Sequence, residues 1–257
     1  MSAPSAPPPR RSALFNAGLG IGCALIGGAA GWYWQSQRIS ADPAGKLSAG
    51  DRAAVEQVVQ DYLLAHPEVL PKAMAALERK QTAAQLAGVR GDVERASMGT
   101  VLGNPQGKLT LVEFTDYACT YCRHSIEDVE RLIAANPDLR VVVRELPILT
   151  PQSTDAAKMA IAAAQQGRYA RFHKAMFENG HPDAQSIEAA AVAAGLDMAA
   201  ARKALADPAT EAELVRNLDL AKRLGFTGTP SWVIGDTVLT GAVGGERLAE
   251  AIAEARS

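Results

Sequence analysis

The sequence is poor in the features on which several classes of protein depend. It has only three cysteines in 257 residues, too few for a small fold held together by several disulfides. It has no basic run interleaved with aromatic residues, and 26 basic side chains nearly balance 28 acidic ones, so no nucleic-acid partner is indicated. Its glycine-rich stretches lack the pattern of a phosphate-binding loop, and no internal repeat is present. What remains is a chain that is 48% hydrophobic, enough for one substantial core or for one domain with smaller attachments.

The N-terminal segment predicts a membrane anchor. Residues 1–12 are rich in Pro, Ser and Ala and are expected to form a disordered cytoplasmic tail. Residues 13–34 carry no formal charge, and at about 1.5 Å per residue they are long enough to cross a hydrocarbon core of about 30 Å. Arg10 and Arg11 precede this run, which favours a cytoplasmic N-terminus and an external main domain. Aromatic residues suited to the membrane interface close the run: Trp32, Tyr33 and Trp34.

Two other interpretations of this run stay open. A cleaved signal peptide would have a shorter apolar core followed by a site of small residues, and a buried helix of a globular domain is the third possibility. The anchor and the signal peptide both place the main domain outside the cytoplasm, which in a bacterium is the oxidising periplasm. We therefore expect a single-pass inner-membrane protein whose main domain lies in the periplasm. Cys23 falls inside the run and is expected to be an inert, membrane-buried side chain.

A linker and a helical extension are expected next. Residues 35–47 are polar, with Gly and Pro, and predict a linker. Residues 48–98 predict a helical segment, in which Ser48 and Asp51 resemble a capping box and Pro67 separates two helices with apolar residues at helical spacing. The extension either packs on the main domain or forms an oligomerisation stalk, which would make the protein a homo-oligomer.

The strongest chemical signal is a Cys-x-x-Cys pair at the junction of a predicted strand and a predicted helix. The strand covers residues 109–114, and an apolar helical pattern follows Cys122. A helix N-terminus presents unpaired N–H groups and partial positive charge, so Cys119 is expected to be stabilised as a thiolate. Cys122, one turn further into the helix, is placed to resolve a mixed disulfide on Cys119.

Glu113 is the second member of the predicted site. A carboxyl group within an apolar strand is costly to bury, so it is expected to have a task or a partner. Burial would raise its pKa and make it a proton acceptor for Cys122. The alternative is an ion-paired acid on a partly exposed face of the strand.

A structural zinc site is the main competing interpretation of the two cysteines. Zinc would need two more ligands, usually a second Cys-x-x-Cys or a spaced pair of histidines. None of the four histidines forms such a pair; we expect His173 and His181 to lie on the surface of a helical region and His124 to face solvent. No metal and no nucleotide are predicted, and the only redox group expected is the cysteine pair itself.

A proline far downstream completes the pattern. Residues 225–236 predict a loop that runs into a strand, followed by a hairpin return and a final helix over 244–255. Pro230 stands at the entrance of that strand, where it is either an ordinary strand-entry residue or the second residue of a cis peptide with Thr229.

The stretch from Glu113 to Cys122, together with the Gly-Thr-Pro-Ser-Trp-Val-Ile-Gly-Asp stretch from Gly228 to Asp236, resembles the DsbA family of thioredoxin-fold proteins. The DsbA-like, ScsC-like and BdbD-like members are the most similar. The resemblance implies an α/β thioredoxin fold over residues 99–257 with a helical insertion at about 155–207. The helices expected within 48–91 resemble the N-terminal extension of ScsC-like proteins.

The resemblance also assigns roles to individual residues. It implies that Cys119 is the nucleophile, that Cys122 resolves the mixed disulfide and that Glu113 is the buried acid. It implies that Pro230 is a cis-proline facing the redox pair, and that the backbone of Thr229 pairs with the substrate peptide.

The chain departs from the family pattern between the two cysteines. Thr120 and Tyr121 stand where DsbA has Pro-His and where ScsC-like members have Pro-Tyr. No histidine is therefore available between the cysteines to donate a hydrogen bond to the Cys119 thiolate, and we expect a less oxidising couple than that of DsbA.

The function expected from these features is dithiol oxidation in exported proteins through a mixed disulfide, with a DsbB-type membrane partner that reoxidises the enzyme. The alternative is a disulfide isomerase or reductase kept reduced by a DsbD-type partner. A hypothesis from another class is a peptide-binding module with chaperone activity and no redox turnover.

Overall fold

The computed structural model describes residues 48–96 and 98–256. The predicted tail (1–12), anchor (13–34) and linker (35–47) lie outside the described residues. Within the described ranges, no helix is both long enough and apolar enough to span a bilayer. The chain divides into two compact units, one ending at Pro71 and the other running from Lys72, and we describe each by itself.

The first unit contains the helix α2 (Ala49–Ala65), which begins where the sequence predicted. Ser48 is its N-cap residue, since the Asp51 backbone N–H donates to Ser48 Oγ at 3.2 Å, while the Ser48 hydroxyl donates to the Asp51 carboxylate at 2.7 Å. Several large apolar side chains of α2 are exposed: Val55, Val58, Val59, Tyr62 and Leu64.

The helix α3 (Val69–Ala87) crosses the boundary between the units and leads into the short helix α4 (Arg90–Val93). Its first half exposes Leu70, Met74 and Leu77, whereas Leu86 at its end is fully buried. Leu86 and Val93 belong to a core cluster on one face of the sheet. The C-terminal end of the helical extension therefore packs on the main domain.

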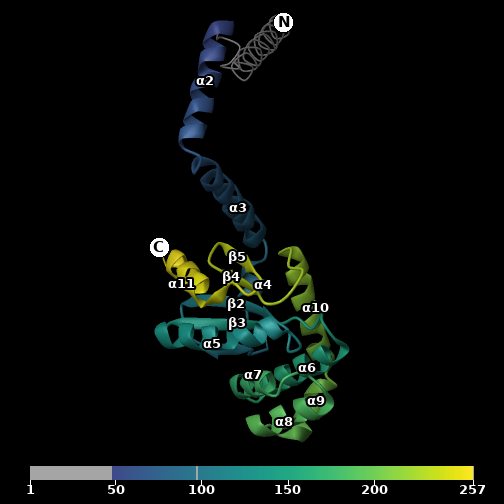
Figure 1. Ribbon diagram of the computed structural model, residues 1–257. Helices are drawn as coiled ribbons and strands as arrows, with labels where there is room; N and C mark the ends of the chain where they lie inside the picture. Colours follow the sequence, from purple (N-terminus) through teal and green to yellow (C-terminus); the bar gives the residue numbers. More distant parts are fainter. Residues whose placement is uncertain (1–47, 97, 257) are drawn as a thin grey trace, which may run out of the picture. The chain divides into compact units, whose positions relative to one another are not determined.

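The second unit is built on a five-stranded mixed sheet of order β1-β3-β2-β4-β5 (Figure 1). The strands are β1 (Val101–Gly103), β2 (Leu109–Thr115), β3 (Leu139–Glu145), β4 (Ser231–Ile234) and β5 (Thr237–Thr240). Strands β2 and β3 are parallel, with Leu109 opposite Leu139 and Thr115 opposite Glu145, and the other pairs are antiparallel. This is the thioredoxin-like α/β arrangement, with β2 at the centre.

Alternate residues of the central strands face two different cores, because successive side chains in a strand point to opposite faces. On one face Leu111 and Val143 pack with α5 (Thr120–Ala135) and α11 (Gly244–Ala255). On the other face Val112 and Val142 pack with α4 and α10 (Pro208–Arg223). Glu113 comes two residues after Leu111 and Glu145 comes two residues after Val143, so both acids lie on the first face of the sheet, where the cysteines also lie.

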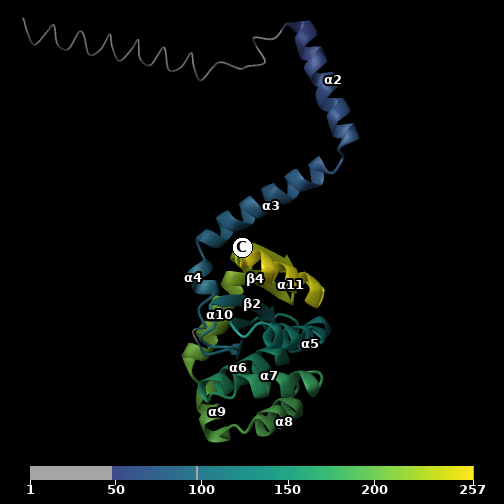
Figure 2. The ribbon, with the colours of Figure 1, turned by 90° about the vertical axis from the view of Figure 1, so that its left-hand side faces the viewer.

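The described chain between β3 and β4 is helical, as the absence of strand-like runs predicted. Its helices are α6 (Pro151–Gln165), α7 (Tyr169–Glu178), α8 (Ala184–Ala194), α9 (Met198–Leu205) and α10. Thr150 and Asp183 cap α6 and α8 through reciprocal bonds with Ser153 and Ser186, which explains where these helices begin. Within this unit, α8 and α9 lie on the side remote from β4 and β5 (Figures 1 and 2).

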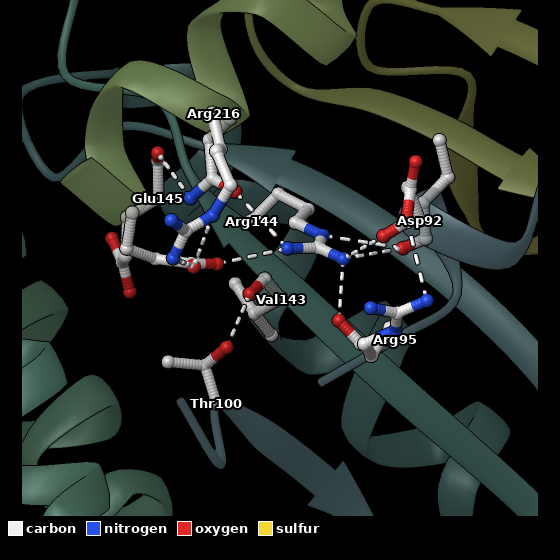
Figure 3. Close-up of polar contacts among 10 residues, drawn as sticks. Asp92, Arg95, Thr100, Val143, Arg144, Glu145 and Arg216 are labelled. Carbon is white, nitrogen blue, oxygen red and sulfur yellow. Dashed lines mark hydrogen bonds and ion pairs between the residues drawn. The ribbon is translucent and has the colours of Figure 1, made fainter. Parts of the chain in front are cut away.

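A buried arginine joins three segments on the α10 face of the sheet (Figure 3). Arg144 of β3 donates to Glu213 at 2.9 Å and to Asn217 at 3.1 Å, both on α10. Its guanidinium also donates to the backbone carbonyls of Asp92, Val93 and Arg95, at the end of α4. The Arg144 and Glu213 side chains are each only 3% exposed, so the charge pair is essentially desolvated.

Candidate active site

The two cysteines lie where β2 gives way to α5. Cys119 is the N-cap residue of α5, and its sulfur accepts a hydrogen bond from the Cys122 backbone N–H at 3.4 Å. Both cysteines are free thiols and both are buried, with Cys119 5% and Cys122 0% exposed. The structure therefore has the predicted strand, cysteine pair and helix N-terminus in one place.

The downstream proline segment lies against Cys119. The Thr229–Pro230 peptide bond is cis, the form that the family resemblance implies. The Cys119 thiol donates to the Thr229 backbone carbonyl at 3.3 Å, although the two residues are 110 positions apart in sequence. The fold thus brings together the cysteine pair and the Thr229–Pro230 segment, which are far apart in the sequence.

The surroundings of Cys119 favour its thiolate. A hydrogen bond from the Cys122 thiol is the largest cause that lowers the pKa of Cys119, to about 5. The Thr229 side chain and the backbone N–H groups of Cys122 and Tyr121 lower this pKa further, while burial opposes them. The Thr229 hydroxyl oxygen has no hydrogen-bond partner among the described residues, so it is available to donate to the sulfur once that is ionised.

Thr229→Val is expected to raise the pKa of Cys119 by about half a unit to one unit, because valine has nearly the same shape and cannot donate to the thiolate. The same change should make the couple less oxidising by about 15–30 mV, since it destabilises the dithiol form. Both are measurable, by alkylation rate against pH and by equilibration with glutathione. An unchanged pKa would show that the hydroxyl does not act on the sulfur.

Cys122 is shifted in the opposite direction. Burial is the largest cause that raises the pKa of Cys122, followed by its hydrogen bond to Cys119 and the charge of Glu113. Of the two thiols, Cys119 is therefore the one that ionises at neutral pH, and Cys122 keeps its proton.

Glu113 is buried in the centre of the sheet. It is 1% exposed, between Val143 of β3 and Trp232 of β4 in the strand register, and neither carboxyl oxygen has a hydrogen-bond partner among the described residues. Burial, and then repulsion from Cys119, raise the pKa of Glu113 to about 8. The alternative of an ion-paired acid on a partly exposed face is wrong.

Asp116 fixes the loop that carries the cysteines, and the sequence analysis missed it. Its Oδ1 accepts from the Ala118 N–H at 2.8 Å, and its Oδ2 accepts from the Ile148 and Leu149 N–H groups at 2.8 and 2.9 Å. Its backbone carbonyl accepts from the Cys119 N–H at 2.9 Å. Asp116 thereby ties the redox loop to a segment whose Ile148 and Leu149 side chains are exposed.

His173 was expected on the surface, and that prediction is wrong. It is 2% exposed, and its Nδ1 lies 3.0 Å from the Tyr117 hydroxyl and 3.2 Å from the Tyr169 hydroxyl. Burial lowers the pKa of His173 to about 3, so the ring is neutral. His124 and His181 are exposed, as expected. Within the described ranges, no group of three or more His, Cys, Asp or Glu side chains is arranged to hold a metal ion.

A thioredoxin-like sheet with a Cys-x-x-Cys pair at a helix N-terminus, facing a cis-proline, is the arrangement of the thiol–disulfide oxidoreductases. The model of the DSBA-like thioredoxin domain matches residues 110–253, more than half of the chain, and the protein belongs to this family. Residues 51–84 match the model of the N-terminal domain of the copper resistance protein ScsC. The chemistry of this family is thiol–disulfide exchange through redox-active cysteines, and the cysteine pair of this chain lies at the start of α5 within the matched domain.

Solved structures agree with this assignment. A thioredoxin-like oxidoreductase from Silicibacter pomeroyi DSS-3 is 41% identical over 61% of this chain and 91% of its own, with a TM-score of 0.59. Proteus mirabilis ScsC in a transitional conformation is 29% identical and covers 82% of this chain and 97% of its own, with a TM-score of 0.61. The thiol-disulfide exchange protein alpha-DsbA2 from Wolbachia pipientis is 25% identical over 69% of this chain and 97% of its own, with a TM-score of 0.64.

Curated relatives match through part of their length. A protein named Na(+)/H(+) antiporter NhaA from Herminiimonas arsenicoxydans is 32% identical over 144 residues, which are 55% of this chain and 23% of that protein. NhaA 3 from Salinispora tropica is 28% identical over 60% of this chain and 24% of its own. The chain thus matches about a quarter of the length of these relatives, and their antiport activity is not carried over to it.

Proposed function

We propose that the protein oxidises dithiols in exported proteins, with Cys119 as the sulfur that exchanges with substrate and Cys122 as the resolving cysteine. The observation that carries this proposal is the placement of the two sulfurs. Cys119 is the N-cap residue of α5, accepts from the Cys122 N–H at 3.4 Å and donates to the Thr229 carbonyl at 3.3 Å, whereas Cys122 is fully buried. This placement lowers the pKa of Cys119 and raises the pKa of Cys122, which favours a thiolate on Cys119 and a thiol on Cys122. A substrate thiolate attacks the Cys119 sulfur of the disulfide form and breaks its bond to Cys122. A second substrate thiolate then attacks the substrate sulfur of the mixed disulfide, and Cys119 leaves as a thiolate. Two electrons pass from the substrate dithiol to the cysteine pair.

Glu113 supplies the proton in this scheme. Cys122 is expelled as a thiolate into a buried site where its charge is unfavourable, so it must take up a proton at once. With a pKa of about 8, the Glu113 carboxyl is largely protonated at neutral pH and can give up that proton. In the reverse direction the Glu113 carboxylate accepts the proton from Cys122.

Thr229 and Pro230 are proposed to bind the substrate peptide. The contact between the Thr229 carbonyl and Cys119 supports this role, since a peptide joined to the sulfur would extend along the Thr229 backbone. Tyr121, Ile148 and Leu149 expose apolar surface on the segments next to the redox loop and would contact the substrate side chains. The lack of a histidine between the cysteines supports a couple less oxidising than that of DsbA.

We propose that the domain works in the periplasm, tethered by the predicted anchor and reoxidised by a membrane partner of the DsbB type. A periplasmic thioredoxin-like protein from Salmonella enterica serovar Typhimurium, 28% identical over 60% of this chain, supports the compartment. The positive charges before the apolar run support a cytoplasmic N-terminus with the main domain on the periplasmic side of the membrane.

A second candidate is an isomerase or reductase kept reduced by a DsbD-type partner. The match of residues 51–84 to the ScsC N-terminal domain favours it, as do the exposed apolar residues of α2 and of the first half of α3, which suit a homo-oligomer. Isomerases of this kind usually associate, so a monomer in solution would count against this candidate.

Trapping the thiols in living cells tests the direction of the reaction. Rapid acid quenching followed by alkylation with a maleimide that adds mass should find the Cys119–Cys122 pair mostly oxidised, because an oxidase waits for substrate in its disulfide form. The matched control is Cys122→Ser, which cannot form the pair. A pair that is mostly reduced in wild-type cells would overturn the oxidase proposal in favour of the second candidate.

A further inference from the structure

Behind the redox loop lies a closed ring of polar groups that the reaction scheme above does not use. Glu145, at the end of β3, accepts from the Tyr117 hydroxyl at 3.1 Å and from the Tyr169 hydroxyl at 2.8 Å, both through Oε1. The same two hydroxyls lie 3.0 and 3.2 Å from His173 Nδ1. All four side chains are buried, and they come from the redox loop, β3 and α7.

The geometry of this ring fixes where its protons are. Each tyrosine has one proton to donate, and both donate to Glu145 Oε1. The two contacts to His173 are then satisfied only if Nδ1 carries the ring proton and shares it between the tyrosine oxygens. This arrangement leaves His173 Nε2 and Glu145 Oε2 as acceptors, and neither has a hydrogen-bond partner among the described residues.

The ring is a neighbour of the proton-transfer site. Thr115 of β2 lies directly opposite Glu145 in the parallel register, and Glu113 is two residues earlier on the same face of β2. From the spacing of strands and residues, the Glu113 and Glu145 Cα atoms are about 8 Å apart. The Thr115 hydroxyl between them has no hydrogen-bond partner among the described residues, and it lies close enough to Cys122 to favour that thiolate.

We propose that Glu145, held by Tyr117, Tyr169 and His173, is a second buried proton-binding group of the redox centre, which acts through Glu113 on the proton exchanged with Cys122. Glu145 is thus a positioning residue for the proton, and this inference rests on the proposed role of Glu113. In the cycle, Glu113 passes one proton to Cys122 as the disulfide opens. The negative charge that Glu113 acquires is disfavoured by an ionised Glu145, so the charge of Glu145 governs how readily Glu113 gives up its proton.

The charges around the two carboxyls support this coupling. Burial is the largest cause that raises the pKa of Glu145, to about 8, while its two tyrosine donors lower it. Repulsion from Glu113 also raises this pKa, so the two carboxyls titrate as a coupled pair. The ionisable groups that face Glu145 are Tyr117 and Asp116 from the loop, Tyr169 and His173 from α7, and Glu113 from β2. Those that face Glu113 are Cys119, Cys122, Glu145, Tyr117 and Tyr169.

The test is the rate of iodoacetamide alkylation of Cys119 in the reduced full chain, measured by peptide mass spectrometry from about pH 4 to about pH 10. In the wild type the rate should rise near pH 5 as Cys119 ionises and show a second inflection near pH 8 from the carboxyl pair. Glu145→Gln should keep the first inflection and lower the second by about one pH unit, because one repelling charge is gone. The matched control is Glu213→Gln, an equally buried acid on the other face of the sheet, which should leave both inflections in place.

Two further variants cover the case in which Glu145→Gln does not fold and test the role of Glu113 separately. If Glu145→Gln does not fold, Tyr169→Phe removes one donor to the Glu145 carboxylate, keeps Glu145 protonated to higher pH, and should lower the second inflection by a smaller amount. The inference is overturned if the second inflection stays at the wild-type pH in folded Glu145→Gln, or in Tyr169→Phe where Glu145→Gln does not fold. It is also overturned if Glu213→Gln shifts the second inflection by the same amount, because the shift would then reflect general destabilisation. Glu113→Gln separates the two proposals: if this variant titrates like the wild type, the role of Glu113 itself is wrong.

Discussion

Replacing Cys119 by serine is expected to reduce the turnover of insulin disulfides to the uncatalysed rate, a loss on the order of 10³-fold or more. In the proposed reaction a covalent bond forms to the Cys119 sulfur, and a serine hydroxyl is not ionised near neutral pH. Cys122 cannot take over, because it is fully buried and the pKa of its thiol is raised by that burial. The measurement is insulin precipitation in the presence of dithiothreitol or glutathione.

Two matched variants complete this experiment. Cys23→Ser removes the third cysteine and should retain wild-type turnover, since Cys23 lies in the predicted anchor. Cys122→Ser should accumulate a mixed disulfide on Cys119 that gel electrophoresis without reductant can detect. Retained turnover in Cys119→Ser would refute the assigned nucleophile, and a wild-type protein that binds peptides without turnover would instead favour the chaperone hypothesis.

Replacing Arg144 by methionine is expected to lower the free energy of unfolding by about 3–5 kcal/mol, as measured by urea denaturation. The change removes the buried cation that faces the Glu213 carboxylate, and three backbone carbonyls at the end of α4 and just after it lose their donor (Figure 3). Removing one partner of a buried charge pair costs far more than the intact pair gains.

Two other variants test whether the loss of stability depends on the burial of the charge pair and not merely on the number of ion pairs removed. Arg216 also pairs with Glu213 but has a side chain that is 54% exposed, so Arg216→Met should cost less than about 1 kcal/mol. The double variant with Arg144→Met and Glu213→Met should recover much of the loss, because both members of the buried pair are replaced by apolar side chains. Equal losses in Arg144→Met and Arg216→Met would contradict this account of the network.

The sequence was sufficient to predict the parts of the molecule that local patterns determine. The strand before Cys119 and the helix after Cys122 follow from runs of adjacent residues, and so does the cap at Ser48. The depth at which Glu113 is buried could also be expected, because its neighbours in the strand are apolar. These features depend on residues a few positions apart, where spacing and propensity are informative.

The groups that the sequence analysis missed have partners far along the chain. Asp116 accepts from N–H groups 32 and 33 positions away, and nothing local distinguishes it from an ordinary turn residue. Glu145 is held by tyrosines that precede and follow it by 28 and 24 positions, so its ring exists only after α7 has packed beside the redox loop.

The burial of His173 could have been predicted from the spacing of apolar residues in the sequence of α7. It occupies one position of an apolar helical face whose other members are Tyr169, Phe172, Met176 and Phe177. Arg171 and Lys174 stand close to it in the sequence and are charged, but in a helix adjacent residues point in different directions, so their charge does not place His173 on the surface. The periodicity of the apolar residues was the better guide than the charge of the immediate neighbours.

The central claim is that the start of α5 and the Thr229 segment together hold Cys119 as a thiolate. The most direct test is the alkylation rate of Cys119 in the reduced wild-type protein as a function of pH, followed on the Cys119 peptide. The structure predicts a main midpoint near pH 5, where the thiolate fraction of Cys119 reaches one half. A midpoint near about 8.5, the value of an ordinary cysteine, would contradict it.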